Sequence, residues 1–406
     1  MSPTTYPASY RFEPPAEIAS LSARWLLLGL VAAIAAIAGA FVSSQQFFRG
    51  YLIGYMLVLG FSLGSLALLM LGHLTGGNWW MIGRRLMEAA VGNLPLLTIL
   101  FLPIWLGRHS LYIWLDPAFI ATHHSVAAKG GYLNETFWTI RAVIYFAIWN
   151  LWALALRKGS LQQDGDASPR VWQKLKVWAA PGMLVYGLTI TLACTDWVMS
   201  LDPAWYSTIF GMFFMISEML SMMALLIVIL CSLRGLAPYD RILGPDKLHD
   251  YGKLMLAFTM VWAYFSFSQW LIIWAGNLPE EITWYLDRIH GGWQAVALAL
   301  VILQFALPFL LLLSRDLKRD ARKLLPVALL VLVMRYVDLY WLVAPNPFPG
   351  SGADAHHLTY HWTYFVVPLA LVSIWMGMFF RQLGKRPLLV VTEPMLPRLW
   401  EASHGH

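Results

Sequence analysis

The sequence predicts an all-α integral membrane protein with about ten transmembrane helices. Three observations lead to this prediction. Of the 406 residues, 59% are hydrophobic and only 12% are charged, whereas soluble domains carry about 25% charged residues. Ten apolar runs are long enough to cross a bilayer, which takes about 20 residues in helical form. Lys and Arg gather in every second connection between these runs, as in multi-pass membrane proteins.

The apolar runs predict helices because backbone polar groups in lipid must be satisfied within the segment. In chain order the predicted spans are residues 24–42, 51–72, 86–106, 138–156, 177–199, 206–233, 253–276, 291–314, 324–343 and 361–381. The third span is the least regular, since Glu88, Asn93, Pro95 and Pro103 fall inside it. These spans make up a transmembrane domain at 24–382, preceded by an N-terminal segment at 1–23 and followed by a C-terminal tail at 383–406.

The distribution of positive charge predicts the orientation. With both termini in the cytoplasm, 22 of the 28 Lys and Arg residues, Arg84 and Arg85 among them, belong to cytoplasmic segments, and Arg141 and Arg335 lie inside spans. Only Arg49, Arg108, Lys129 and Arg288 fall in outer loops. The positive-inside rule therefore predicts cytoplasmic termini. The net charge of +6 indicates contact with membrane lipid and not with nucleic acid.

Several classes of site are not expected. Cys194 and Cys231 are the only cysteines, which leaves no ligand set for an iron–sulfur cluster or structural zinc. His73 and His361 lie near opposite span ends, which does not fit a bis-histidine haem. We therefore expect this chain to bind no metal or cofactor of its own. Most tryptophans near the outer boundary are interpreted as an aromatic belt: Trp114, Trp138, Trp197, Trp205, Trp284, Trp293, Trp341 and Trp362.

Polar side chains within or beside the spans are candidate functional residues, because a charge in the bilayer is costly unless it is paired or hydrated. Their spread across the whole membrane depth predicts a proton pathway. Toward the cytoplasm lie Glu88, His249, Asp250 and Lys253; near the middle lie Glu218, Tyr264 and Gln269; toward the outside lie Arg141, Asp196, Arg335, Asp338 and His361.

Glu218 is the central candidate. It has apolar neighbours on both sides in the sixth run, and a carboxyl group in such surroundings favours its protonated form, which suits a proton carrier. The alternative is a protonated side chain that only holds a neighbouring helix. Arg335 and Asp338, spaced i, i+3, are expected to pair, and Asp196 is expected to pair with Arg141. Either pair is also compatible with a purely structural role.

Three stretches resemble a known family. They are residues 78–88 (NWWMIGRRLME), residues 195–208 (TDWVMSLDPAWYST), and residues 249–253 (HDYGK) with their continuation through 262–269 (WAYFSFSQ) to 277–281 (NLPEE). These stretches resemble the F subunit of bacterial alternative complex III, a quinol:cytochrome c oxidoreductase, and the wider NrfD-like class of polysulfide-reductase membrane subunits. Of the candidate residues, Asp196, His249, Asp250 and Lys253 are carried over from the matching stretches.

The resemblance implies two four-helix bundles, formed by spans 2–5 and 6–9, with spans 1 and 10 flanking them. It implies a bacterial inner-membrane subunit beside a homologous membrane C subunit, a multihaem cytochrome with c-type haems and an iron–sulfur protein. The complex would oxidise menaquinol or ubiquinol, and this subunit would support proton translocation through polar half-channels. Two alternatives stay open: a quinone-binding subunit, with Arg141, Asp196 and His361 at the site, and a structural anchor for the complex.

Overall fold

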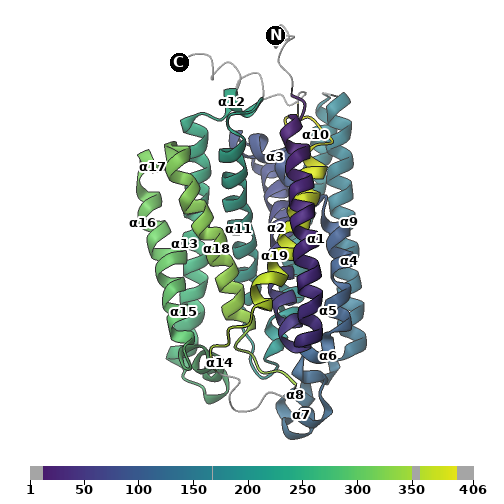
Figure 1. Cartoon of the computed structure of the whole chain (residues 1–406), viewed down its shortest axis with the longest axis vertical. Helices are drawn as coiled ribbons and strands as arrows, with labels where there is room; N and C mark the ends of the chain where they lie inside the picture. Colours follow the sequence, from purple (N-terminus) through teal and green to yellow (C-terminus); the bar gives the residue numbers. More distant parts are fainter. Residues whose placement is uncertain (1–11, 167, 350–356, 391–406) are drawn as a thin grey trace.

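The computed structural model describes residues 12–166, 168–349 and 357–390. Within these residues the secondary structure is entirely helical, and ten helices are long and apolar enough to cross a membrane. The predicted fold class is therefore confirmed: the chain is an all-α, multi-pass membrane protein (Figure 1). The predicted terminal segments are described only in part, since residues 1–11 and 391–406 lie outside the described residues.

The spans follow the predicted order. The first five are formed by α1 (Ala16–Val42), α2 (Ser44–Thr75), the broken run of α3 (Asn78–Val91), α4 (Leu94–Leu100) and α5 (Leu102–Leu106), α9 (Glu135–Gly165), and α10 (Pro169–Trp197). The other five are formed by α11 (Phe210–Leu233), α13 (Pro245–Gly276), the run of α15 (Trp293–Ala299), a π-helix (Leu300–Ala306) and α16 (Leu307–Leu313), α18 (Ala321–Val343), and α19 (Thr363–Leu383).

Short helices occupy the connections. They are α6 (Arg108–Leu111), α7 (Pro117–Thr122), α8 (His124–Ala127), α12 (Tyr239–Ile242), α14 (Pro279–Ile289) and α17 (Arg315–Arg319), with single 3₁₀ turns at Ile113–Leu115, Ala128–Gly131 and Met199–Leu201. Asp116 begins α7 by accepting a hydrogen bond from the Ala118 backbone N–H at 2.9 Å, which is a standard N-cap.

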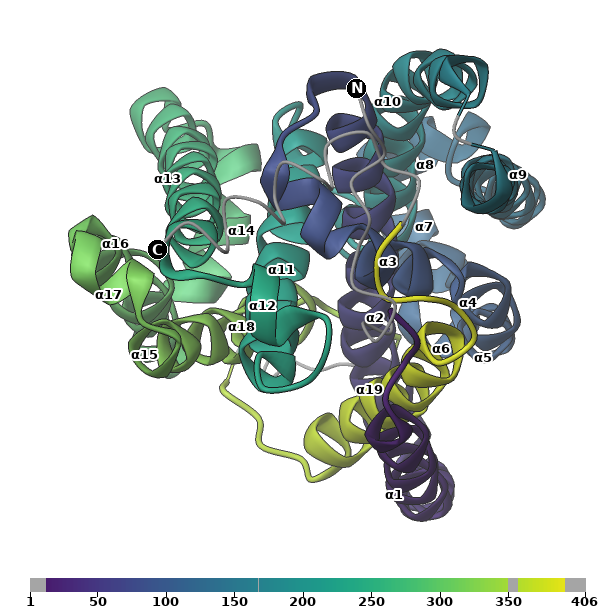
Figure 2. The same cartoon turned by 90° about the horizontal axis from the view of Figure 1, so that it is seen from above.

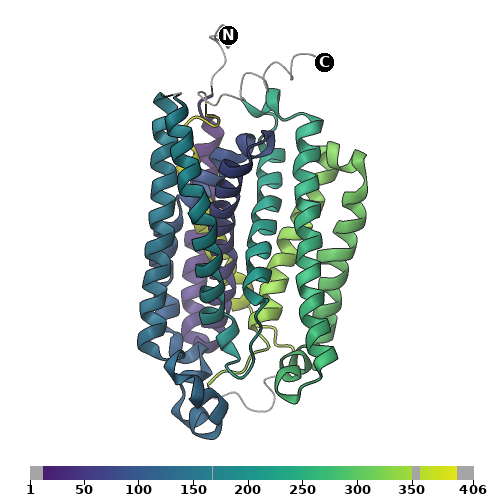
Figure 3. The ribbon, with the colours of Figure 1, turned by 180° about the vertical axis from the view of Figure 1, so that it is seen from behind.

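The spans form two helix bundles joined along α2 and α11. The first bundle contains α2, α3–α5, α9 and α10, and the second contains α11, α13, α15–α16 and α18 (Figures 1 and 3). Helix α19 packs on α2, and α1 packs on α19, so the two flanking spans lie together on one side (Figure 2). Helices α2 and α11 are consequently the most buried of the ten spans.

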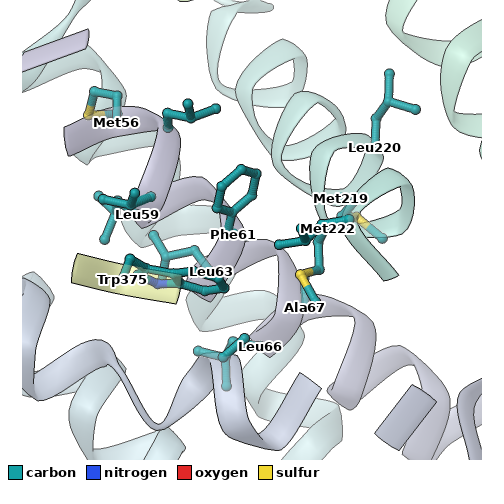
Figure 4. Close-up of a cluster of buried hydrophobic side chains, with 14 of the residues drawn as sticks. Met56, Leu59, Phe61, Leu63, Leu66, Ala67, Met219, Leu220, Met222 and Trp375 are labelled. Atoms are coloured by element: carbon teal, nitrogen blue, oxygen red, sulfur yellow. The ribbon is translucent and has the colours of Figure 1, made fainter. Parts of the chain in front are cut away.

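Apolar side chains fill the contact between α2 and its neighbours. Phe61 of α2 packs against Trp375 of α19 with ring centroids 5.3 Å apart, while Met219 and Met222 of α11 lie on the other side of α2 (Figure 4). All four side chains are at most 8% exposed. Because lipid supplies little hydrophobic driving force between helices, close packing of this kind is what holds membrane bundles together.

Two arginines of the outer loops differ from the sequence-based expectation. Arg49 and Arg288 are buried, at 4% and 1% exposure. Arg49 donates to the carbonyl oxygens of Ala344, at 3.0 Å, and Asn346. Arg288 donates to the carbonyl oxygens of Trp341 and Leu342 at 3.2 and 3.1 Å. Both guanidinium groups therefore bind carbonyls at the C-terminal end of α18, which lack partners within the helix.

The aromatic-belt interpretation is wrong for most of the outer tryptophans. Six of the eight are buried at 0–3% exposure between helices and connecting loops: Trp114, Trp138, Trp197, Trp205, Trp284 and Trp293. Their rings turn toward neighbouring elements and pack on one another; the Trp205 and Trp284 rings, for example, stack 4.4 Å apart. Trp362, at 42% exposure, remains compatible with an interfacial position.

Candidate functional site

Glu218 lies where the two bundles meet. Its side chain is 1% exposed, and its Oε2 atom accepts a hydrogen bond of 2.8 Å from the Tyr186 hydroxyl of α10. Its Oε1 atom has no hydrogen-bond partner among the described residues. A buried carboxyl with one bonded and one unbonded oxygen is able to exchange a proton with an ordered water, which is how such groups are usually satisfied.

Glycines on α2 create the space for Glu218. A Cβ atom at Gly60 would lie 3.4 Å from the Glu218 Cγ atom, and one at Gly64 would lie 2.7 Å from the Glu218 carbonyl carbon. The Gly60-x-x-x-Gly64 spacing is the small-residue pattern that allows two membrane helices to approach closely. This pattern was readable in the sequence, and it explains why the α2 backbone passes so close to the carboxyl-bearing turn of α11.

The predicted pair of Arg335 and Asp338 is confirmed in α18. Arg335 donates to the Asp338 carboxylate, and the two side chains are 3% and 1% exposed. The Arg335 guanidinium also lies over the Phe214 ring, 5.3 Å from its centroid. Phe214 and Glu218 are spaced i, i+4 and share a face of α11. The ion pair therefore approaches Glu218 from the second bundle.

The predicted pair of Arg141 and Asp196 is also confirmed, near the end of the bundle opposite α1's first turn. Arg141 Nε and Nη2 each donate to Asp196 at 2.8 Å, a bidentate geometry that is among the strongest available to this pair. The Tyr145 hydroxyl donates to Asp196 Oδ2 at 2.8 Å. Asp196 is fully buried, so both of its oxygens are engaged by side chains of α9.

Polar groups connect this pair with Glu218 along α10. Tyr186, Thr189 and Asp196 share one helical face and are at most 6% exposed. Thr189 Oγ1 accepts a hydrogen bond of 2.9 Å from Trp149 Nε1. Trp149 in turn stacks on Tyr145, with ring centroids 6.0 Å apart. The interface of α9 and α10 therefore carries hydroxyl and carboxyl groups from the middle of the molecule to this end, which we call the Asp196 end.

Glu88 is held firmly by its neighbours. Arg84 Nε and Arg85 Nη1 donate to its two oxygens at 2.9 and 2.7 Å. Arg85 also donates to Asp164 and, at 3.0 Å, to Ser160 of α9. Arg84 and Arg85, which the sequence analysis assigned to a loop, are 0% and 3% exposed within α3. The charges are tolerated there because carboxylates of α3 and α9 neutralise them.

The other candidates predicted for the cytoplasmic side, His249, Asp250 and Lys253, lie at the surface of α13. Lys253 Nζ forms an ion pair of 2.9 Å with Asp250, and the two side chains are 53% and 38% exposed. His249, on the preceding turn, is half-buried. The predicted cytoplasmic entry is thus divided between a buried cluster around Glu88 and an exposed pair on α13. Exposed pairs of this kind contribute little to stability.

Tyr264, Gln269 and His361 do not join Glu218. Tyr264 is 63% exposed on the outer face of α13. Gln269 is buried but binds Ser207 at 3.0 Å and Tyr285 at 3.3 Å, close to the outer loops. His361 precedes α19, and its Nδ1 atom lies 2.6 Å from Thr363 Oγ1. Within the described residues, no hydrogen bond or ion pair joins His361 to Arg141 or Asp196.

A cleft lies beside the Asp196 end. It measures about 300 Å³ and is lined by residues of the 3₁₀ turn at Ala128–Gly131 and of the loop that follows α10, including Lys129, Tyr132 and Thr195. The Tyr132 ring lies 3.9 Å below the Arg141 guanidinium, and the Tyr132 carbonyl accepts from Arg141 Nη1 at 3.0 Å. A ligand in this cleft would therefore contact Tyr132, which packs against Arg141.

No metal site is formed by the residues that the structure describes, since nowhere do three His, Cys, Asp or Glu side chains come together. Compared with models of known protein families and with curated protein sequences, the chain matches none of them.

Proposed function

We propose that this chain is a membrane subunit of a bacterial respiratory quinol:cytochrome c oxidoreductase and that it supports proton translocation in that complex. The observation that carries the proposal is Glu218, a buried carboxyl at the contact of two bundles with one unbonded oxygen. Carboxyl groups buried within the membrane are common elements of proton relays. The resemblance of the sequence motifs supports the type of complex, and the buried polar groups support a role in proton translocation.

The proposed route runs from Glu218 toward the Asp196 end. Tyr186 orients the Glu218 carboxyl through Oε2, which leaves Oε1 as the atom that gains and loses the proton. Thr189, on the same face of α10, offers a hydroxyl group one turn farther along. The Arg141–Asp196 pair lies at the exit. Ordered waters between these groups would complete the transfer, since the side chains alone do not form an unbroken chain.

Glu88 takes a structural role in this proposal. Both of its oxygens are bound to guanidinium groups, and a carboxylate held by two cations resists protonation. Proton entry is assigned to the neighbourhood of His249, Asp250 and Lys253, which is open to solvent on the side of the bundle where α1 begins. Following the charge distribution, that side is proposed to face the cytoplasm and the Asp196 end to face outward.

The proposed complex supplies the redox chemistry. The chain itself would bind no cofactor, while partner subunits would carry c-type haems and iron–sulfur clusters and oxidise menaquinol or ubiquinol. The test is to isolate an affinity-tagged version of this chain from native membranes in mild detergent. We expect a c-type haem spectrum and quinol:cytochrome c reductase activity in the purified fraction. A stable chain that purifies without cytochrome would contradict the proposal.

A second candidate is a quinone-binding subunit. It is favoured by the cleft of about 300 Å³ beside Tyr132, whose ring packs against the guanidinium group of Arg141. His361 does not take part, because its hydrogen bond is to Thr363. Photo-crosslinking of a labelled quinone analogue to residues 128–133 or 199–206 would support this candidate. Crosslinking only to a partner subunit would count against it.

A further inference from the structure

Four arginines and two carboxylates gather around a small cavity at the end of the bundle where α1 begins. The cavity, of about 10 Å³, is lined by Arg85, Glu88, Arg157, Gln382 and Arg386. Arg84 and Asp164 complete the cluster through their contacts with Glu88 and Arg85. The cluster, which we call the arginine cluster, brings together α3, α9 and the last turn of α19, and it carries an excess of positive charge.

The hydrogen bonds leave part of this charge unsatisfied. Arg85 is 3% exposed, and its Nε atom has no hydrogen-bond partner among the described residues. The same holds for Arg157 Nε, although Arg157 Nη2 donates to Gln382 at 3.1 Å. Arg386 approaches Glu88 only at 3.9 Å. Glu88 is already bound by two closer guanidinium groups, so among the described residues Arg157 and Arg386 have no carboxylate partner as close.

The absence of a side chain at Gly92 makes room for the Arg157 guanidinium group. A Cβ atom at Gly92 would lie 3.1 Å from the Arg157 guanidinium carbon, so the guanidinium rests on the bare end of α3. Burial lowers the pKa of Arg386, and Arg85 adds to this effect while Glu88 opposes it. An anion between Arg157 and Arg386 would relieve the repulsion among the guanidinium groups.

The surroundings indicate where such an anion would come from. On α9, Leu154 and Leu161 flank Arg157 at i−3 and i+4 and are both 49% exposed, so Arg157 shares a helix face with apolar side chains that face lipid. Helix α9 continues to Gly165, roughly 12 Å beyond Arg157 at the helical rise. Arg157 directly follows the predicted span at residues 138–156, which is where the lipid headgroups are expected.

We propose that the arginine cluster binds the phosphate group of an anionic membrane lipid. The phosphate lies at the mouth of the cavity, because the cavity itself holds little more than a water molecule. Arg157 and Arg386 bind the phosphate oxygens from either side, and the acyl chains run along the lipid-facing surface of α9. Recognition of phosphate by paired guanidinium groups is a common use of arginine. The proposal does not depend on the respiratory role.

The test measures lipid binding to the purified, delipidated full-length chain by native mass spectrometry. The probes are phosphatidylglycerol, phosphatidylcholine and inorganic phosphate. We expect phosphatidylglycerol to be retained preferentially, and Arg157→Gln with Arg386→Gln to weaken its binding about 20- to 30-fold, since each arginine near a membrane surface contributes about 1 kcal/mol. The matched control is Arg170→Gln with Lys174→Gln, which removes the same charge from exposed positions on α10.

Two results would overturn the proposal. One is unchanged phosphatidylglycerol binding in the Arg157 and Arg386 double variant, or an equal loss in the control variant. The other is displacement of the lipid by inorganic phosphate at an equal concentration, which would show that the site takes free phosphate. If the double variant does not fold, Arg386→Gln alone is measured, with an expected loss of about fivefold.

Discussion

Replacing Gly64 by alanine should weaken the contact between the two bundles, whereas the same change at Gly60 should not. A Cβ atom at Gly64 would lie 2.7 Å from the Glu218 carbonyl carbon and 3.2 Å from the Met219 backbone nitrogen. Both are backbone atoms, so the clash cannot be relieved by a change of side-chain rotamer. A Cβ atom at Gly60 would meet only side-chain atoms of Glu218, Cγ at 3.4 Å and Cβ at 4.0 Å, which are ordinary contact distances.

The two variants differ in packing but share the gain in helix propensity, which is up to about 1 kcal/mol for glycine to alanine. Overpacking typically costs about 1–3 kcal/mol. We therefore expect Gly64→Ala to be less stable than Gly60→Ala by about 2 kcal/mol. The assay is denaturant unfolding of the purified protein in detergent, followed by tryptophan fluorescence. Equal unfolding midpoints for the two variants would refute the close approach of α2 to Glu218.

Three further substitutions test the polar groups. Tyr186→Phe removes the hydrogen bond to Glu218 Oε2 and should cost about 1–3 kcal/mol of unfolding free energy, with fewer protons released per electron; wild-type proton output would argue against its role. Asp196→Asn leaves the Arg141 charge without its partner and should cost about 3–5 kcal/mol, part of which Arg141→Gln should restore. Tyr264→Phe, at an exposed position, should change the unfolding free energy by less than about 0.5 kcal/mol and leave proton output intact, and a drop in output would return Tyr264 to the pathway.

Much of the fold was predictable because hydrophobic length and charge placement are direct consequences of the bilayer. The side of each helix on which an individual residue lies was not predictable. In a membrane helix both the lipid-facing and the protein-facing surfaces are apolar. The spacing of apolar residues therefore did not show that Tyr264 of α13 faces away from the bundle and Glu218 of α11 faces into it. The same ambiguity led us to place buried tryptophans such as Trp138 in an aromatic belt.

Two ion pairs were predicted from the sequence, Arg335 with Asp338 and Arg141 with Asp196, whereas the other buried contacts between helices were not. Arg335 and Asp338 follow from their i, i+3 spacing. The bond between Tyr186 and Glu218 depends on the register of α10 against α11, which the sequence does not specify. Arg85 was assigned to a loop because hydropathy alone does not show that Asp164, far along the chain, neutralises it inside the bundle.

The role of Glu218 is tested most directly by measuring electrons and protons together. Glu218→Gln keeps an oxygen that accepts from Tyr186 but removes the exchangeable proton. The proposed parent complex carrying this variant is purified and reconstituted in liposomes, and quinol-to-cytochrome electron transfer is recorded alongside proton release. We expect electron transfer to continue while the number of protons released per electron falls. An unchanged number of protons per electron would contradict a relay through Glu218.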